Sequence, residues 1–148
     1  MTGPTSSAYA GDVDVREAWK ILKENERAQL IDVRTAAEWA FVGLPDLGEL
    51  HRPVHRVEWQ TFPAMQVNAD FVEQAKVLLD GVGASVETPI LFLCRSGARS
   101  RAAAVAMTAA GFKRSFNIAA GFEGDADPSG HRGTVGGWKA AGLPWRQT

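Results

Sequence analysis

The chain has 148 residues, of which 45% are hydrophobic and 22% are charged, and its formal net charge is -1. This composition excludes a disordered chain and predicts one globular domain over residues 12–148, after a flexible N-terminus over residues 1–11. The near-neutral charge gives no general attraction to nucleic acid or to acidic membranes. Neither a signal peptide nor a run of 18 apolar residues is visible, and a single cysteine suits a reducing compartment, so we expect a cytoplasmic protein.

The first predicted element is an amphipathic helix that begins near Asp12. Its apolar side chains recur at the spacing i, i+3, i+4 and i+7 and therefore share one face: Val15, Ala18, Trp19 and Leu22. Asp14 followed by Glu17 is typical of a helix start.

Strands and helices then alternate. Residues 28–34 predict a buried strand, residues 35–43 a short helix ended by Gly43, and residues 52–59 a second strand. A clear amphipathic helix follows over residues 68–81, with Asn68 as its N-cap. Its inward residues are predicted to be Phe71, Ala75 and Leu78.

In the second half of the chain, the continuous apolar run ILFLC at residues 90–94 is typical of a strand in a sheet covered on both faces. A helix over 99–110, a strand over 115–121 and a last helix over 137–145 follow. The pattern predicts an α/β fold of three layers, with a central parallel sheet of about five short strands flanked by helices on both faces. A long glycine-rich loop, residues 123–137, remains between the last strand and the last helix.

The only cysteine, Cys94, ends the strand at 90–94 and precedes a helix. In parallel sheets, ligands bind at the carboxyl ends of the strands. Thiols attack as thiolates, and Arg95, Arg99, the helix N-terminus and the loop backbone all offer positive charge or hydrogen-bond donors to an anion. A lone cysteine after an apolar strand is more often an inert core residue, but that alternative does not explain two arginines in the same turn.

Several motifs resemble the single-domain rhodanese family over roughly residues 12–145. They are LIDVRTAAEW at residues 30–39, LCRSGARS at 93–100, AAGF with NIAAGFEG at 117–124, and GGWKAAGLPW near the end. The resemblance implies a rhodanese-like fold and a sulfurtransferase similar to thiosulfate sulfurtransferases. It also implies that Cys94 takes a sulfane sulfur from a donor such as thiosulfate, becomes a persulfide, and passes the sulfur to a thiophilic acceptor.

The resemblance also implies roles for the neighbouring residues. Cys94 would be catalytic, and the loop from Arg95 to Ser100 would bind the substrate: Arg95, Ser96, Gly97, Ala98, Arg99 and Ser100. Asp32 and Arg34 would support the site, with Asp32 holding an arginine or capping the next helix. The expected partners are a small anionic sulfur donor and a thiol, cyanide-like or protein acceptor, with no cofactor, metal, nucleic acid or membrane.

Two features depart from the family pattern or favour rivals. Glu38 stands where some thiosulfate-using members carry an arginine, so we expect Arg95 and Arg99 to bind the anion. Cysteine-based phosphatases and arsenate reductases place an arginine six residues after the cysteine, whereas here the sixth residue is Ser100 and the arginine is the fifth. A non-catalytic persulfide carrier or interaction module is the other alternative.

His51, His55 and Glu58 lack a fourth ligand for a metal, and His131 in the long loop is a candidate acid.

Overall fold

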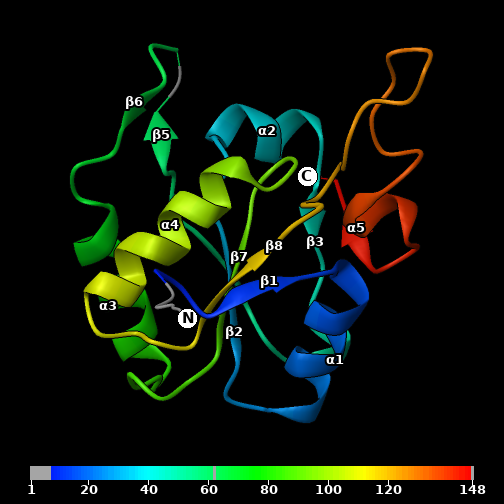
Figure 1. The fold of residues 1–148 in the computed structure, drawn as a ribbon. Coiled ribbons are helices and arrows are strands. Elements are labelled where there is room, and N and C mark those ends of the chain that lie inside the picture. The colour runs from blue at the N-terminus through cyan, green and yellow to red at the C-terminus, as the bar shows by residue number, and fades with distance from the viewer. Residues whose placement is uncertain (1–7, 62, 148) are drawn as a thin grey trace, which may run out of the picture.

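A five-stranded parallel sheet forms the centre of the molecule, with the strand order β1-β8-β7-β2-β4 (Figure 1). The computed structural model describes residues 8–61 and 63–147; residues 1–7, on which most of the predicted flexible N-terminus falls, lie outside the described residues. The strands are β1 (Gly11–Val13), β2 (Gln29–Asp32), β4 (Val54–Arg56), β7 (Ile90–Leu93) and β8 (Ser115–Ile118).

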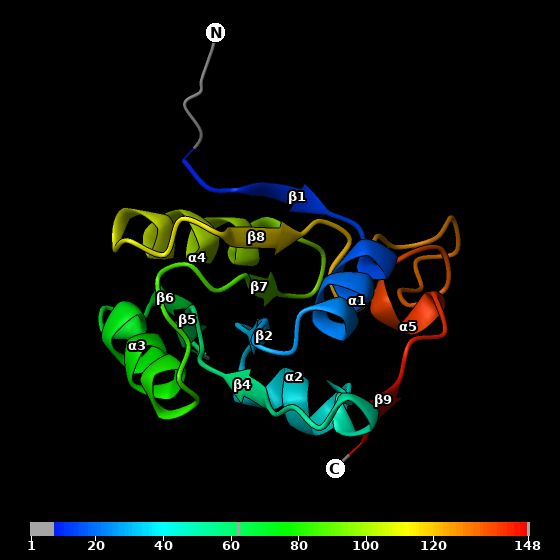
Figure 2. The same ribbon diagram turned by 90° about the horizontal axis from the view of Figure 1, so that it is seen from below.

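Helices cover both faces of this sheet, as Figure 2 shows with the sheet seen nearly edge-on. Helices α3 and α4 lie on one side, and α1 and α5 lie on the other. The helices are α1 (Val15–Glu24), α2 (Ala36–Phe41), α3 (Phe71–Gly81), α4 (Ala98–Ala109) and α5 (Gly137–Ala140). This is the rhodanese-like three-layer α/β fold that the alternation of elements predicts.

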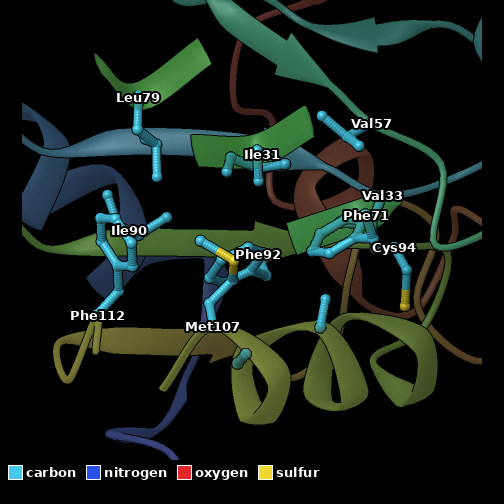
Figure 3. Packing of buried hydrophobic residues seen from close by; sticks show 13 residues of the cluster. Ile31, Val33, Val57, Phe71, Leu79, Ile90, Phe92, Cys94, Met107 and Phe112 are labelled. Atoms are coloured by element: carbon cyan, nitrogen blue, oxygen red, sulfur yellow. The ribbon is translucent and has the colours of Figure 1, made fainter. Parts of the chain in front are cut away.

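The strand β7 shows why its sequence is apolar throughout. Ile90 and Phe92 pack toward α3 and α4 (Figure 3), whereas Leu91 and Leu93 pack toward α1 and α5. All four side chains are fully buried. Because successive residues of a strand point to opposite faces, a central strand between two helical layers needs apolar residues at every position. Each such burial contributes about 1.5–3 kcal/mol relative to exposure.

Two small antiparallel pairs extend from the main sheet. One joins β3 (Leu44–Pro45) to β9 (Trp145–Arg146), and the other is the hairpin of β5 (Gln60–Thr61) and β6 (Gln66–Val67). A single 3₁₀ turn, Gly48–Leu50, lies between β3 and β4. These pairs are two residues long per strand, too short to leave an alternating pattern in the sequence.

The N-terminal prediction needs one correction. The helix α1 begins at Val15, with Asp14 as its N-cap accepting a bond from the Glu17 N–H at 2.7 Å, so the predicted helix start is confirmed. The residues before it, however, form β1, an edge strand of the main sheet. With only three residues and one neighbour, that strand carries no hydrophobic alternation that would reveal it.

The prediction for α3 was also wrong in two details. The N-cap position is Asp70, while the Asn68 side chain accepts from the Asp70 N–H at 3.0 Å. The inner face consists of Phe71, Ala75 and Leu79, and Leu78 is 37% exposed. The i, i+4, i+8 spacing from Phe71 selects Leu79, and of two adjacent leucines only one can face the sheet. No helix within the described residues is long and apolar enough to cross a bilayer.

Candidate active site

Cys94 lies directly after β7, at the carboxyl edge of the central sheet and before α4. Its sulfur accepts a hydrogen bond from the Gly97 N–H at 3.0 Å, and the Ser100 hydroxyl, a second group able to donate, lies 3.2 Å away. Within the described residues, no other donor reaches Sγ. The sulfur is therefore contacted by fewer groups than the whole Arg95–Ser100 loop that the sequence suggests. The partly buried Ser96 and the exposed Ala98 complete the loop.

Glycines allow this loop to pack closely on the segment after β8. A Cβ atom on Gly97, which has φ of 114°, would lie 2.1 Å from the Ala119 carbonyl oxygen. A Cβ atom on Gly121, which has φ of 68°, would lie 2.5 Å from the Arg95 carbonyl oxygen. The Phe122 N–H donates to the Cys94 carbonyl at 2.8 Å. The motif at 117–124 therefore shapes the cysteine loop through its backbone.

The Cys94 side chain is 1% exposed and belongs to the core cluster on the α3/α4 side. Figure 3 shows it at the end of that cluster, beyond Phe92 and near Val33 and Phe71, with its sulfur pointing toward α4.

A cavity of about 500 Å³ lies next to this loop, at the same edge of the sheet. Its charged lining residues come from α2, the cysteine loop and the 123–137 loop: Glu38, Arg95, Arg99, Glu123 and Arg132. The long glycine-rich loop thus contributes two charged side chains to the mouth of the site. His131, the candidate acid, is exposed and does not line this cavity.

Glu38 holds Arg99 in the mouth of the site. Two bonds join the carboxylate to the guanidinium, Nη1 to Oε1 at 2.7 Å and Nη2 to Oε2 at 3.0 Å. Glu38 also closes the capping box of α2 with Thr35. Burial alone would raise the pKa of Glu38. The hydrogen bonds and the positive charge of Arg99, together with the hydrogen bonds from Thr35, outweigh the effect of burial, and the pKa of Glu38 is lowered. Hydrogen bonding to Glu38 raises the pKa of Arg99.

The supporting pair, Asp32 and Arg34, lies together as the sequence suggests. Both side chains are fully buried, and Arg34 Nη2 bonds Asp32 Oδ2 at 2.7 Å and the Gly43 carbonyl at 2.8 Å. The guanidinium lies 4.4 Å from the centre of the Phe122 ring. Phe122 in turn bonds the Cys94 carbonyl through its own N–H, so the pair lies one residue away from the cysteine loop, and its supporting role stays a prediction.

The histidine considered as a metal ligand has another role. His55 is buried and its Nε2 lies 2.9 Å from the Gln29 Oε1, an arrangement that joins β4 to β2. Burial lowers the pKa of His55. Among residues 8–61 and 63–147, no three His, Cys, Asp or Glu side chains group in a way that could hold a metal ion.

Four residues of the site escaped the sequence reasoning or were given a different role. Glu38 was interpreted as the replacement of an arginine rather than as a partner of Arg99. No pattern in the sequence pointed to Glu123 or Arg132, which line the cavity, or to Asn117, whose Oδ1 lies 2.6 Å from the Ser100 Oγ. A signal for Glu38 existed, since a Thr-x-x-Glu capping box fixes the side chain at the start of α2.

A family model described as STR4 middle domain matches residues 10–148 of the chain. The chain belongs to this family. The assignment to the single-domain rhodanese family was therefore wrong, because the family whose model matches is the STR4 middle domain, although the rhodanese-like fold holds.

The chain is also similar to curated proteins and to a solved structure over most of its length. The Rickettsia conorii protein RC0915, named as uncharacterized, is 37% identical over 130 residues that cover 88% of this chain and 92% of that protein. RP600 of Rickettsia prowazekii, also named as uncharacterized, is 35% identical with the same coverage. The crystal structure of Rv0390 from M. tuberculosis has a TM-score of 0.85 and 46% identity, and the match covers 95% of this chain and 99% of that one.

A more distant structure shares the fold alone. The solution structure of the polysulfide-sulfur transferase homodimer from Wolinella succinogenes has a TM-score of 0.57 and 24% identity, and the match covers 95% of this chain and 82% of that one.

Proposed function

We propose that this protein is a sulfurtransferase in which Cys94 carries the transferred sulfur as a persulfide. The observation that supports this most is the surroundings of Sγ at the N-terminal end of α4, where the Gly97 N–H donates at 3.0 Å and the Ser100 hydroxyl lies 3.2 Å away. A hydrogen-bond donor and a helix N-terminus stabilise a negative sulfur, whether thiolate or persulfide, and the Ser100 hydroxyl adds a second donor when its proton turns toward Sγ. A core cysteine without a chemical role needs neither.

The transfer takes two displacements. The Cys94 thiolate attacks the outer sulfur of the donor, a new S–S bond forms, and the donor's S–S bond breaks with its electron pair leaving on the remainder. That remainder is sulfite from thiosulfate or a shortened chain from a polysulfide. An acceptor thiolate or cyanide then attacks the outer sulfur of the persulfide and returns Cys94 to a thiolate.

The charges at the mouth give only a weak attraction to an anionic donor and do not distinguish a polysulfide from thiosulfate. Three arginines and two glutamates line the cavity, which leaves one net positive charge. Arg99, one of the two arginines expected to attract the anion, is already neutralised by Glu38. The fold shared with a polysulfide-sulfur transferase supports testing polysulfide first, since a terminal sulfur on a narrow chain also suits a nearly covered thiol.

The activity test compares the wild-type protein with Cys94→Ser. We expect polysulfide or thiosulfate to support transfer to cyanide or to a thiol in the wild type, and the variant to lose at least about a thousandfold while keeping its circular dichroism spectrum and melting temperature. Equal rates in the two proteins would end the proposal. Parallel assays with an aryl phosphate and with arsenate test the rival chemistries, and turnover of either in place of sulfur transfer would replace it.

A further inference from the structure

A buried polar chain leads from Cys94 to the outer edge of the sheet. The Ser100 Oγ lies 3.2 Å from Cys94 Sγ and 2.6 Å from the Asn117 Oδ1. The Asn117 Nδ2 donates to the Asp12 Oδ1 at 3.0 Å. Ser100 and Asn117 are fully buried, and the chain runs from the end of β7 through α4 and β8 to β1.

Asp12 fixes the direction of the Asn117 amide. A carboxylate only accepts hydrogen bonds, so the amide turns its NH₂ group toward Asp12 and its oxygen toward Ser100. Asp12 is itself held by the Tyr9 hydroxyl at 2.9 Å from Oδ1 and by Arg101, whose Nη2 lies 3.8 Å from Oδ2. The orientation of a buried amide is thus set by one carboxylate at the edge of the sheet.

The Ser100 hydroxyl has one proton and two acceptors within reach, Sγ and the Asn117 oxygen. The shorter distance, 2.6 Å, favours donation to Asn117. The Ser100 oxygen then turns a lone pair toward Sγ, where it accepts from an S–H group and disfavours a thiolate. Only the Gly97 N–H continues to support a negative sulfur in that arrangement.

We propose that Asp12 restrains the reactivity of Cys94 by holding the Ser100 proton on Asn117. When the carboxylate is lost, the amide can turn, its NH₂ group donates to Ser100, and the hydroxyl proton becomes free for the thiolate or persulfide. Asp12 is a positioning residue, separated from Cys94 by two side chains. The inference depends on the proposed function only in taking Cys94 as the nucleophile.

The test measures alkylation of Cys94 by iodoacetamide at neutral pH, which is specific because the chain has one cysteine. Asp12→Ala removes the acceptor of the Asn117 NH₂ group and is expected to raise the rate about tenfold, as one added hydrogen bond to a charged group would. Tyr9→Phe is the matched control: it removes a bond to the same carboxylate oxygen but leaves Asn117 held, and its rate should stay within about twofold. An unchanged or slower rate in Asp12→Ala overturns the inference.

Removing a negative charge or loosening β1 would also speed alkylation, and a double variant separates these causes. The gain from Asp12→Ala should vanish when Ser100→Ala is already present, because the hydroxyl that moves is then missing. A gain of equal size in the Ser100→Ala background overturns the inference, since direct charge or loosening needs no hydroxyl. Alkylation requires no sulfur donor, so a failure of sulfur transfer would leave this result standing, and the reverse also holds.

Discussion

Releasing Arg99 from Glu38 should change which donors the protein prefers. Glu38→Gln keeps the capping box with Thr35, because glutamine accepts the same bonds, but it removes the charge that neutralises Arg99. A unit charge about 4 Å from an anion is worth about 1 kcal/mol in bulk water and about 4 kcal/mol at an effective dielectric constant of 20. The cavity is open, so we use the lower figure of about 1 kcal/mol per unit charge on the donor. This energy corresponds to a KM that is about fivefold lower for a singly charged donor and about 25-fold lower for a doubly charged one.

The assay compares KM for thiosulfate and for a thiol persulfide of lower charge, at low and high salt. We expect the Glu38→Gln protein to gain more for thiosulfate, and salt to reduce that gain. Loss of a bidentate, mostly buried ion pair should also lower the unfolding free energy by about 1–2 kcal/mol, between the values for exposed and buried pairs. Glu73→Gln, on the exposed face of α3, is the charge-matched control with no expected change in KM. Equal KM changes for the two donors would refute the view that Glu38 sets the charge of the mouth.

Three further predictions follow from the geometry. Gly97→Ala should cost at least about 3 kcal/mol in denaturant unfolding, because φ is 114° and the new Cβ would lie 2.1 Å from the Ala119 carbonyl; a loss under 1 kcal/mol would contradict this. Burial lowers the pKa of His55, so the folded state binds fewer protons than the unfolded state, and stability should fall as pH drops below about 6.5; His55→Gln should flatten that profile, and an identical profile would refute the assignment. Arg132→Ala should raise the donor KM about two- to fivefold with kcat unchanged, because Arg132 lines the cavity. A change in kcat alone would refute the view that Arg132 attracts the donor.

The sequence predicted the parts of this fold that depend on long, one-sided or fully buried patterns. The run ILFLC predicted a central strand and the spacing from Val15 to Leu22 predicted a helix face, and both are confirmed. The predicted position of Cys94 at a strand end before a helix is likewise what the structure has. In each case the burial pattern repeats with the period of the element, so neighbouring residues report on one another.

The rest depends on contacts between residues far apart in the chain. Glu38 and Arg99 are 61 residues apart, and Asp12 and Asn117 are 105 apart, so nothing local in the sequence pairs them. The edge strand β1 forms because β8 offers it hydrogen bonds, not because three residues favour a strand. The sequence also offered Arg99 as a free cation, and only the fold reveals the carboxylate that neutralises it.

The central claim, that Cys94 carries a transferable sulfur, is tested most directly by intact mass spectrometry. The protein is incubated with stoichiometric polysulfide, separated from it, weighed, and then treated with cyanide. We predict a gain of one sulfur atom, mapped to the peptide with Cys94, absent from Cys94→Ser, and released by cyanide as one equivalent of thiocyanate. No gain with polysulfide, thiosulfate or a thiol persulfide, or an equal gain in Cys94→Ser, would contradict the claim.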